Sequence, residues 1–262
     1  MSTLGYILLF TFIGSIGALI GGLILLSHRK FALKISHFLA SFAAGTLLGT
    51  AFLDLLPEAS HEAASNAAGA EKSGINIFLW TLIGIIIFFF LERFIHWFHH
   101  HEKSHEHDKE TKPALPLIII GDTVHNFLDG VVIAATFLVS IPLGVVTTWA
   151  VFAHEIPQEI GDFGLMLHKG LSRGKIILVN ILSATVAFLG AIITYLLGNV
   201  LEIYIPIFLA LTAGFFIYIA TSDLIPEIHY EKSRKFAVIK SLLLLLGVIL
   251  IGASVNFFEH GQ

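Results

Sequence analysis

The sequence predicts an all-α, polytopic membrane protein with eight transmembrane helices. Hydrophobic residues make up 56% of the 262 residues, charged residues make up only 13%, and the mean hydropathy is +0.86. This composition is far more apolar than that of an average soluble domain. Eight apolar stretches, each close to the roughly 20 residues that cross a bilayer, fill nearly the whole chain.

The predicted spans leave little sequence for any other domain. We expect them at about residues 4–27, 36–57, 75–98, 115–139, 143–167, 175–198, 203–226 and 236–257. The first stretch lacks the basic start and the small-residue cleavage site of a signal peptide, so it counts as the first span. We therefore expect residues 1–262 to form a single transmembrane domain.

The positive charges predict how this domain is oriented. Of the 15 Lys and Arg residues, all but Lys72 fall in the connections between spans 1 and 2, 3 and 4, 5 and 6, and 7 and 8, or close beside them. Connections rich in Lys and Arg stay in the cytoplasm. We therefore expect both termini to be extracytoplasmic. We also expect the protein to reside in the cell membrane, plasma or inner, although the charges do not indicate which membrane.

One connection is long and polar. Residues 96–112 contain six histidines among Glu, Asp and Lys, which has the composition of a disordered segment. Such a cytoplasmic loop between spans 3 and 4 could bind metal reversibly, or it could be a solvated loop without that role. The chain has no cysteine, so a metal would be held by His, carboxylate or amide groups. No basic patch with interleaved aromatic residues suggests nucleic acid binding.

Two neighbouring spans carry most of the polar residues within the membrane. Span 4 contains GDTVHNFLDG and span 5 contains AHEIPQEIGD. Buried ionisable groups cost roughly 2.5–3.5 kcal/mol each on insertion scales, so they are candidates for function. Residues three or four apart share a helix face, and spans joined by a short link pack together. The candidate metal ligands are His125, Asn126, Asp129, His154, Glu155 and Gln158.

Other polar residues surround these candidates. Asp122, Glu159 and Asp162 could be ligands, or they could be packing partners of the ligands. Pro157 interrupts the backbone hydrogen bonds of span 5 in mid-membrane, a feature typical of substrate sites in transporters.

A short motif occurs twice in the chain. D-L-x-P-E occupies residues 54–58 at the end of span 2 and residues 223–227 at the end of span 7. His61 and Glu62 follow the first copy, and His229 and Glu231 follow the second. With the orientation above, one copy lies outside and the other inside. The sequence therefore predicts an inverted repeat, as alternating-access transporters have, with an acidic vestibule at each mouth.

The motifs of spans 4 and 5 resemble those of the ZIP (Zrt/Irt-like) metal-ion transporters. HNFLDG is similar to the family's HNxxD element, and HEIPQEIGD is similar to the HExPHExGD pattern of one subgroup. The resemblance extends over the eight spans and the His-rich loop. It implies uptake of a divalent metal ion toward the cytoplasm, most favourably Zn²⁺ and otherwise Fe²⁺, Mn²⁺ or Cd²⁺. It also implies that the transporter is a homodimer and that it uses neither a cofactor nor ATP.

The resemblance also implies roles for individual residues. His125, Asp129, His154 and residue 158 would form the main metal site, and Asn126 and Glu155 would belong to an adjoining second site. The subgroup has His where this chain has Gln158. Some relatives complete the second site with a Glu in span 6, where this chain offers only Asn180 and hydroxyl residues.

Three other functions fit parts of the sequence. HEIPQ resembles the H-E-x-x-H zinc helix of metalloproteases, with Gln158 in place of the second His. The His-rich loop also occurs in cation exporters, and a proton channel or membrane sensor would need buried polar groups too. We expect a transporter rather than an enzyme, because eight spans and two converging polar stripes favour a path for ions.

Overall fold

A computed structural model describes residues 1–26, 29–67, 75–97, 114–168, 171–201, 204–226 and 233–260, and within these ranges the chain forms helices and no strand. The predicted His-rich loop lies outside them from residue 98 onward. The helical elements are α1 (Thr3–Phe12), η1 (Ile13–Gly17), α2 (Ala18–Leu26), α3 (Arg29–Thr50), η2 (Ala51–Leu55), α4 (Leu56–Ala67), α5 (Ile77–Trp97), α6 (Ala114–Val139), α7 (Ile141–His168), α8 (Arg173–Leu201), α9 (Ile205–Tyr218), η4 (Ile219–Leu224) and α11 (Arg234–His260). The three η elements are π-helical turns that continue the α-helices beside them.

The described elements form eight long helical stretches, which confirms the predicted all-α fold. Six of these stretches are long and apolar enough to cross a membrane. The apolar part of α5 is shorter, at Ile77–Leu91, and α7 carries Glu155, Glu159 and Asp162 in its second half. The second stretch runs from Arg29 to Ala67 and is longer than the predicted 36–57, because helix continues into polar residues at both ends.

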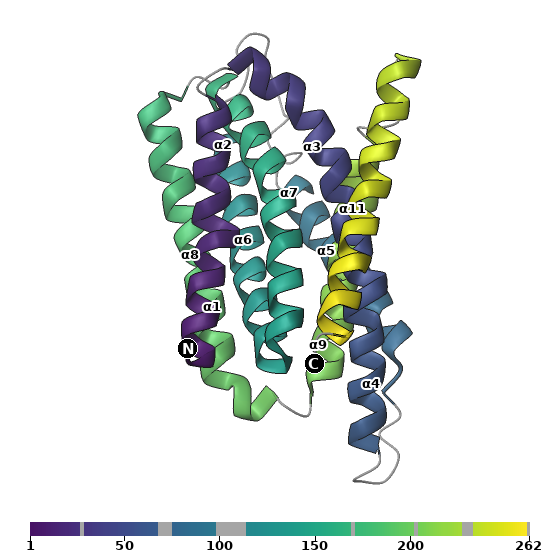
Figure 1. The fold of residues 1–262 in the computed structure, drawn as a ribbon. Coiled ribbons are helices and arrows are strands. Elements are labelled where there is room, and N and C mark those ends of the chain that lie inside the picture. The colour runs from purple at the N-terminus through teal and green to yellow at the C-terminus, as the bar shows by residue number, and fades with distance from the viewer. Residues whose placement is uncertain are drawn as a thin grey trace.

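The stretches run up and down beside one another (Figure 1). The N- and C-termini lie at the same end, as an even number of crossings requires. We call this the terminal end. We call the opposite end the basic end, because α8 and α11 begin there with the exposed residues Arg173, Lys175, Arg234 and Lys235. Toward this end α7 finishes and α6 starts.

Glycines allow three helix pairs to pack with their backbones in contact. A Cβ atom on Gly130 of α6 would collide with the backbone of Ala187 in α8, and one on Gly190 of α8 would collide with that of Phe127. Close approach through small residues is a common way to associate helices in membranes. The same relationship joins α3 to α11 through Gly45 and Gly247, and α5 to α9 through Gly84 and Gly214.

The repeated D-L-x-P-E motif has the same backbone form in both copies. Asp54 lies in η2 just before Pro57, and Asp223 lies in η4 just before Pro226. Proline cannot donate to the carbonyl four residues earlier, so the helix ladder is interrupted beside it. Helices α3 and α9 run in opposite directions, and each packs against the π-helical turn of the other. This arrangement agrees with the predicted inverted repeat. Residues 227–231 lie outside the described part.

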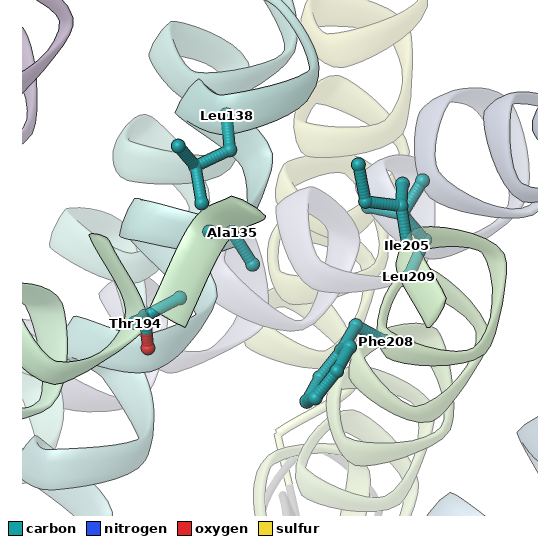
Figure 2. A pocket seen from close by; sticks show the side chains of 7 residues that line it. Ala135, Leu138, Thr194, Ile205, Phe208 and Leu209 are labelled. Atoms are coloured by element: carbon teal, nitrogen blue, oxygen red, sulfur yellow. The ribbon is translucent and has the colours of Figure 1, made fainter. Parts of the chain in front are cut away.

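Two cavities lie away from the polar residues of α6 and α7. Figure 2 shows a crevice of about 10 Å³ between α6, α8 and α9, where Thr194 is the one polar side chain among seven lining residues. The Thr194 hydroxyl donates to the carbonyl of Gly190 at 2.9 Å. A larger apolar groove of about 670 Å³ lies between α3, α7 and α11. Neither lining offers an ionisable group that could hold a cation.

Candidate metal centre

Four side chains from α6 and α7 bring one ligand atom each to a common point. His125 and Asp129 lie one turn apart on α6, and His154 and Glu155 are adjacent on α7. Nε2 of His125 is 3.0 Å from Nε2 of His154. We call this set the four-residue group. The convergence expected from the two polar stripes is therefore observed.

The spacing of these atoms is close to that of a tetrahedral metal site. Zn²⁺ binds nitrogen and oxygen at about 2.0–2.2 Å, which puts tetrahedral ligand atoms about 3.3–3.6 Å apart. Nε2 of His125 lies 3.4 Å from Oε1 of Glu155 and 3.7 Å from Oδ2 of Asp129. Nε2 of His154 lies 3.5 Å from Oδ2 of Asp129 and 3.8 Å from Oε1 of Glu155. All four atoms lie within 4.8 Å of one another.

The two carboxylate oxygens of this group accept no hydrogen bond. Asp129 Oδ2 and Glu155 Oε1 are buried and have no such partner in the structure. A buried acceptor without a donor is costly, and a buried charge is costlier still unless it is paired. Both oxygens point toward the two imidazoles. A divalent cation between the four atoms would satisfy both oxygens at once.

A second contact orients His154. Its Nδ1 donates to the carbonyl oxygen of Ala150 at 3.1 Å, because a carbonyl can only accept. In the neutral ring the proton is then on Nδ1, and the lone pair of Nε2 faces His125. Metal-binding histidines are commonly held in this way.

Aromatic rings cover the imidazoles. Phe88 of α5 meets His125 edge-on at 6.1 Å between ring centroids, and Phe216 of α9 meets His154 at 6.3 Å. Phe88 is 8% exposed and Phe216 is 1% exposed. These rings limit the access of water on this side, and they bring α5 and α9 into the wall of the site.

Asn126 lies in a separate polar network. Its Nδ2 donates to Oδ1 of Asp122 at 3.0 Å and to Oγ of Ser183 at 3.4 Å. Its Oδ1 accepts from Oγ of Ser15 at 3.2 Å, and the same hydroxyl reaches the carbonyl of Ala184 at 2.9 Å. Oδ1 of Asn126, the atom that would bind a metal, thus already accepts a hydrogen bond from Ser15.

Sequence reasoning missed Ser15. The signal was present, because Ser15 is a polar residue between glycines in an otherwise apolar span, in the segment IGSIG. The π-helical turn η1 places the serine toward α6 and α8, and its side chain is 3% exposed. Ser15 therefore joins α1 to the polar residues of two other helices.

The remaining predicted residues lie along α7. Gln158 is half-buried, one turn beyond His154 toward the basic end. Pro157 is buried within the continuous helix. Glu155 brings its own oxygen into the four-residue group, as a potential metal ligand does. In a metalloprotease of the H-E-x-x-H kind the glutamate is the general base and not a ligand.

A second set of potential ligands lies on α4. Glu58, His61 and Glu62 bring their ligand atoms within 4.8 Å of one another, and His61 is exposed. Glu58 ends the first D-L-x-P-E motif, and His61 and Glu62 follow it. Helix α4, which carries all three, lies toward the terminal end (Figure 1). Their position fits the vestibule that the sequence predicts at that mouth.

Comparisons with known proteins agree on one family. The family model described as ZIP zinc transporter matches residues 2–116 and 102–254. The chain is 34% identical over 220 residues to zinc transporter ZIP13 of Pongo abelii, covering 81% of this chain and 65% of that protein. It is 27% identical over 283 residues to the ZIP13 homolog of Drosophila melanogaster, covering 87% of this chain and 79% of that protein. It is 37% identical over 153 residues to zinc transporter ZIP6 of Homo sapiens, covering 55% of this chain but only 20% of that protein.

Proposed function

Because the chain belongs to the ZIP zinc transporter family, we propose that it carries divalent metal ions, Zn²⁺ foremost, across a membrane toward the cytoplasm. The metal is the transported substrate and not a resident cofactor. The relatives named above are called zinc transporters. A transporter of this kind need not perform covalent chemistry, so we propose no enzymatic activity.

One observation carries this proposal: the four-residue group lies in the middle of two long helices. Two imidazole nitrogens and two carboxylate oxygens suit a borderline cation such as Zn²⁺. The group has no thiolate, which would bind Zn²⁺ more firmly. Mixed nitrogen and oxygen ligands favour release, and a transporter has to release its substrate.

The metal path would run from the terminal end to the basic end. Glu58 and Glu62 on α4 would attract cations at the entrance, since carboxylates concentrate cations near them. The four-residue group would then bind the ion between α6 and α7. The two D-L-x-P-E motifs pack in opposite orientations and would let the bundle open to each side in turn. We further propose that the protein acts in the cell membrane as a homodimer.

Metal uptake into reconstituted vesicles tests this function. We expect His125→Ala and His154→Ala each to abolish Zn²⁺ uptake, because each removes one of the two nitrogen ligands. His37→Ala is the matched control, since His37 is an exposed histidine on α3, and it should transport as the wild type does. Undiminished uptake in both site variants would contradict the proposal.

A further inference from the structure

Aromatic rings from α5 and α9 close one side of the four-residue group. The ring of Phe88 meets that of His125 edge-on, at an interplanar angle of 89°. The ring of Phe216 meets that of His154 at an angle of 62°. We call Phe88 and Phe216 the aromatic cover. Each of the two imidazoles therefore has one ring of the cover against it.

The contact between α5 and α9 holds Phe88 in this position. A Cβ atom on Gly84 would collide with the backbone of α9, and one on Gly214 would collide with the backbone of α5, so the two helices touch at this level. Phe88 lies one turn beyond Gly84. Phe215 and Tyr218 of α9 pack against it, each with its ring centroid 5.5 Å from that of Phe88. Phe88 is thus packed against α9 as well as against His125.

The cover lies against the ligand that is most accessible to water. The side chain of His125 is 11% exposed, compared with 6% for Asp129, 2% for Glu155 and 1% for His154. His125 is the residue that Phe88 contacts. A phenyl ring offers no atom that can bind a metal ion, and it takes the space that a water molecule would need. On this side, a metal ion would therefore have protein ligands and no water ligands.

The number of available ligands decides which ions fit. Zn²⁺ is satisfied by four ligands in tetrahedral geometry, and the four-residue group supplies four ligand atoms. Mn²⁺ prefers six oxygen-rich ligands in octahedral geometry, so it needs water in addition to these four atoms. We propose that the aromatic cover makes the four-residue group selective for Zn²⁺ by excluding water ligands, with Phe88 as the specificity-determining residue. This inference rests on the proposed function.

Shortening Phe88 should admit water beside the metal. A cavity lined only by apolar groups stays dry, because a buried water needs two to four polar partners. The space left by Phe88→Ala would adjoin the metal site, where the bound ion and the carboxylate oxygens of Asp129 and Glu155 supply such partners. Water in that space could complete a five- or six-coordinate shell.

The visible absorption spectrum of Co²⁺ bound to the purified full chain tests this directly. Four-coordinate Co²⁺ absorbs several-fold more strongly than six-coordinate Co²⁺. We expect the strong band in the wild type and a band about threefold weaker or less in Phe88→Ala, because geometry follows the number of ligands. Phe88→Met keeps an apolar side chain of nearly the same volume and should keep the strong band. Phe90→Ala is the matched control, since Phe90 is an exposed phenylalanine on the same helix, and it should match the wild type.

Competition between Zn²⁺ and Mn²⁺ for binding to the same proteins separates specificity from packing. If Phe88 only stabilises the fold, Phe88→Ala should weaken both ions by the same factor and leave the Co²⁺ spectrum unchanged. If Phe88 excludes water, the affinity for Mn²⁺ relative to Zn²⁺ should rise by about tenfold in Phe88→Ala and stay unchanged in Phe88→Met. If Phe88→Ala does not fold, Phe88→Val removes less volume and is measured in the same way.

The outcomes for the cover and for transport can be told apart. A weak Co²⁺ band in the wild type, or an unchanged band or an unchanged affinity ratio in Phe88→Ala, would overturn the role of the cover, while Zn²⁺ uptake by the wild type would leave the transport proposal standing. The expected changes in Phe88→Ala without Zn²⁺ uptake by the wild type would refute transport and keep the cover as a determinant of metal binding.

Discussion

Oδ2 of Asp129 lies 3.5 Å from Nε2 of His154, across the boundary between α6 and α7, and it accepts no hydrogen bond. This carboxylate oxygen is thus positioned to bind a metal ion, and burial deprives it of hydrogen bonds from water.

Asp129→Asn should weaken Zn²⁺ binding. The amide keeps the size of the carboxylate but replaces the charged oxygen Oδ2, which accepts no hydrogen bond, with a neutral and weaker ligand. We expect about 10–100-fold weaker Zn²⁺ binding. Because a ligand stabilises the state that it binds, added Zn²⁺ should raise the melting temperature of the wild type more than that of the variant. Equal shifts would show that Asp129 is not a ligand.

Ser15→Ala should destabilise the bundle. The serine hydroxyl donates to Oδ1 of Asn126 in a buried site, and its removal leaves that oxygen without a donor. Such a loss costs about 1–3 kcal/mol in the free energy of unfolding, which denaturant titration measures. Ser254→Ala is the control, because that hydroxyl bonds the carbonyl of Leu250 within its own helix, and it should have a much smaller effect.

The same variant tests whether Asn126 binds metal. If Asn126 belonged to a second metal site, as the family resemblance implies, freeing its oxygen from Ser15 should strengthen metal binding. If Asn126 is held for packing alone, metal binding by Ser15→Ala should equal that of the wild type while stability falls.

Gly190→Val should prevent correct folding. A side chain at this position would collide with the backbone of Phe127, so α6 and α8 would have to separate. We expect little monodisperse protein on size-exclusion chromatography. Gly161→Ala is the contrasting change, because a Cβ there meets nothing within 4 Å. Alanine favours helix over glycine by about 1 kcal/mol, so this variant should be at least as stable as the wild type.

The eight helices and the convergence of His125, Asp129 and His154 could be predicted from sequence, because apolar length and helical spacing are local properties. Spacing also places residues four apart on one face, and it therefore put Glu155 on an adjoining stripe with Glu159. In the structure Glu155 shares the four-residue group with its neighbour His154. Two side chains that are adjacent in sequence point to different sides of their helix. Both can reach a common point when the partner helix faces the gap between them. Residue spacing alone does not show where the partner helix lies.

The partners of Asn126 on other helices could not be predicted. Ser15 is 111 residues away in sequence, and no pattern within span 4 indicates that span 1 packs there. The same holds for Asn180, which meets Glu159 across the pair formed by α7 and α8. Contacts of this kind depend on how helices pack, and the glycines that fix the packing act through backbone contact rather than through a recognisable motif.

Gln158→His should shift metal preference toward Zn²⁺. Gln158 lies one turn beyond His154 and is half-buried, so an imidazole there would stand beside the four-residue group. Imidazole suits Zn²⁺ better than an amide oxygen does, whereas Mn²⁺ prefers oxygen. We expect Zn²⁺ to compete more strongly against Mn²⁺ and Fe²⁺ for uptake into vesicles. Gln158→Leu offers no ligand, so it separates loss of the amide from gain of the imidazole. If relative uptake is the same in the wild type and both variants, residue 158 does not contact the metal.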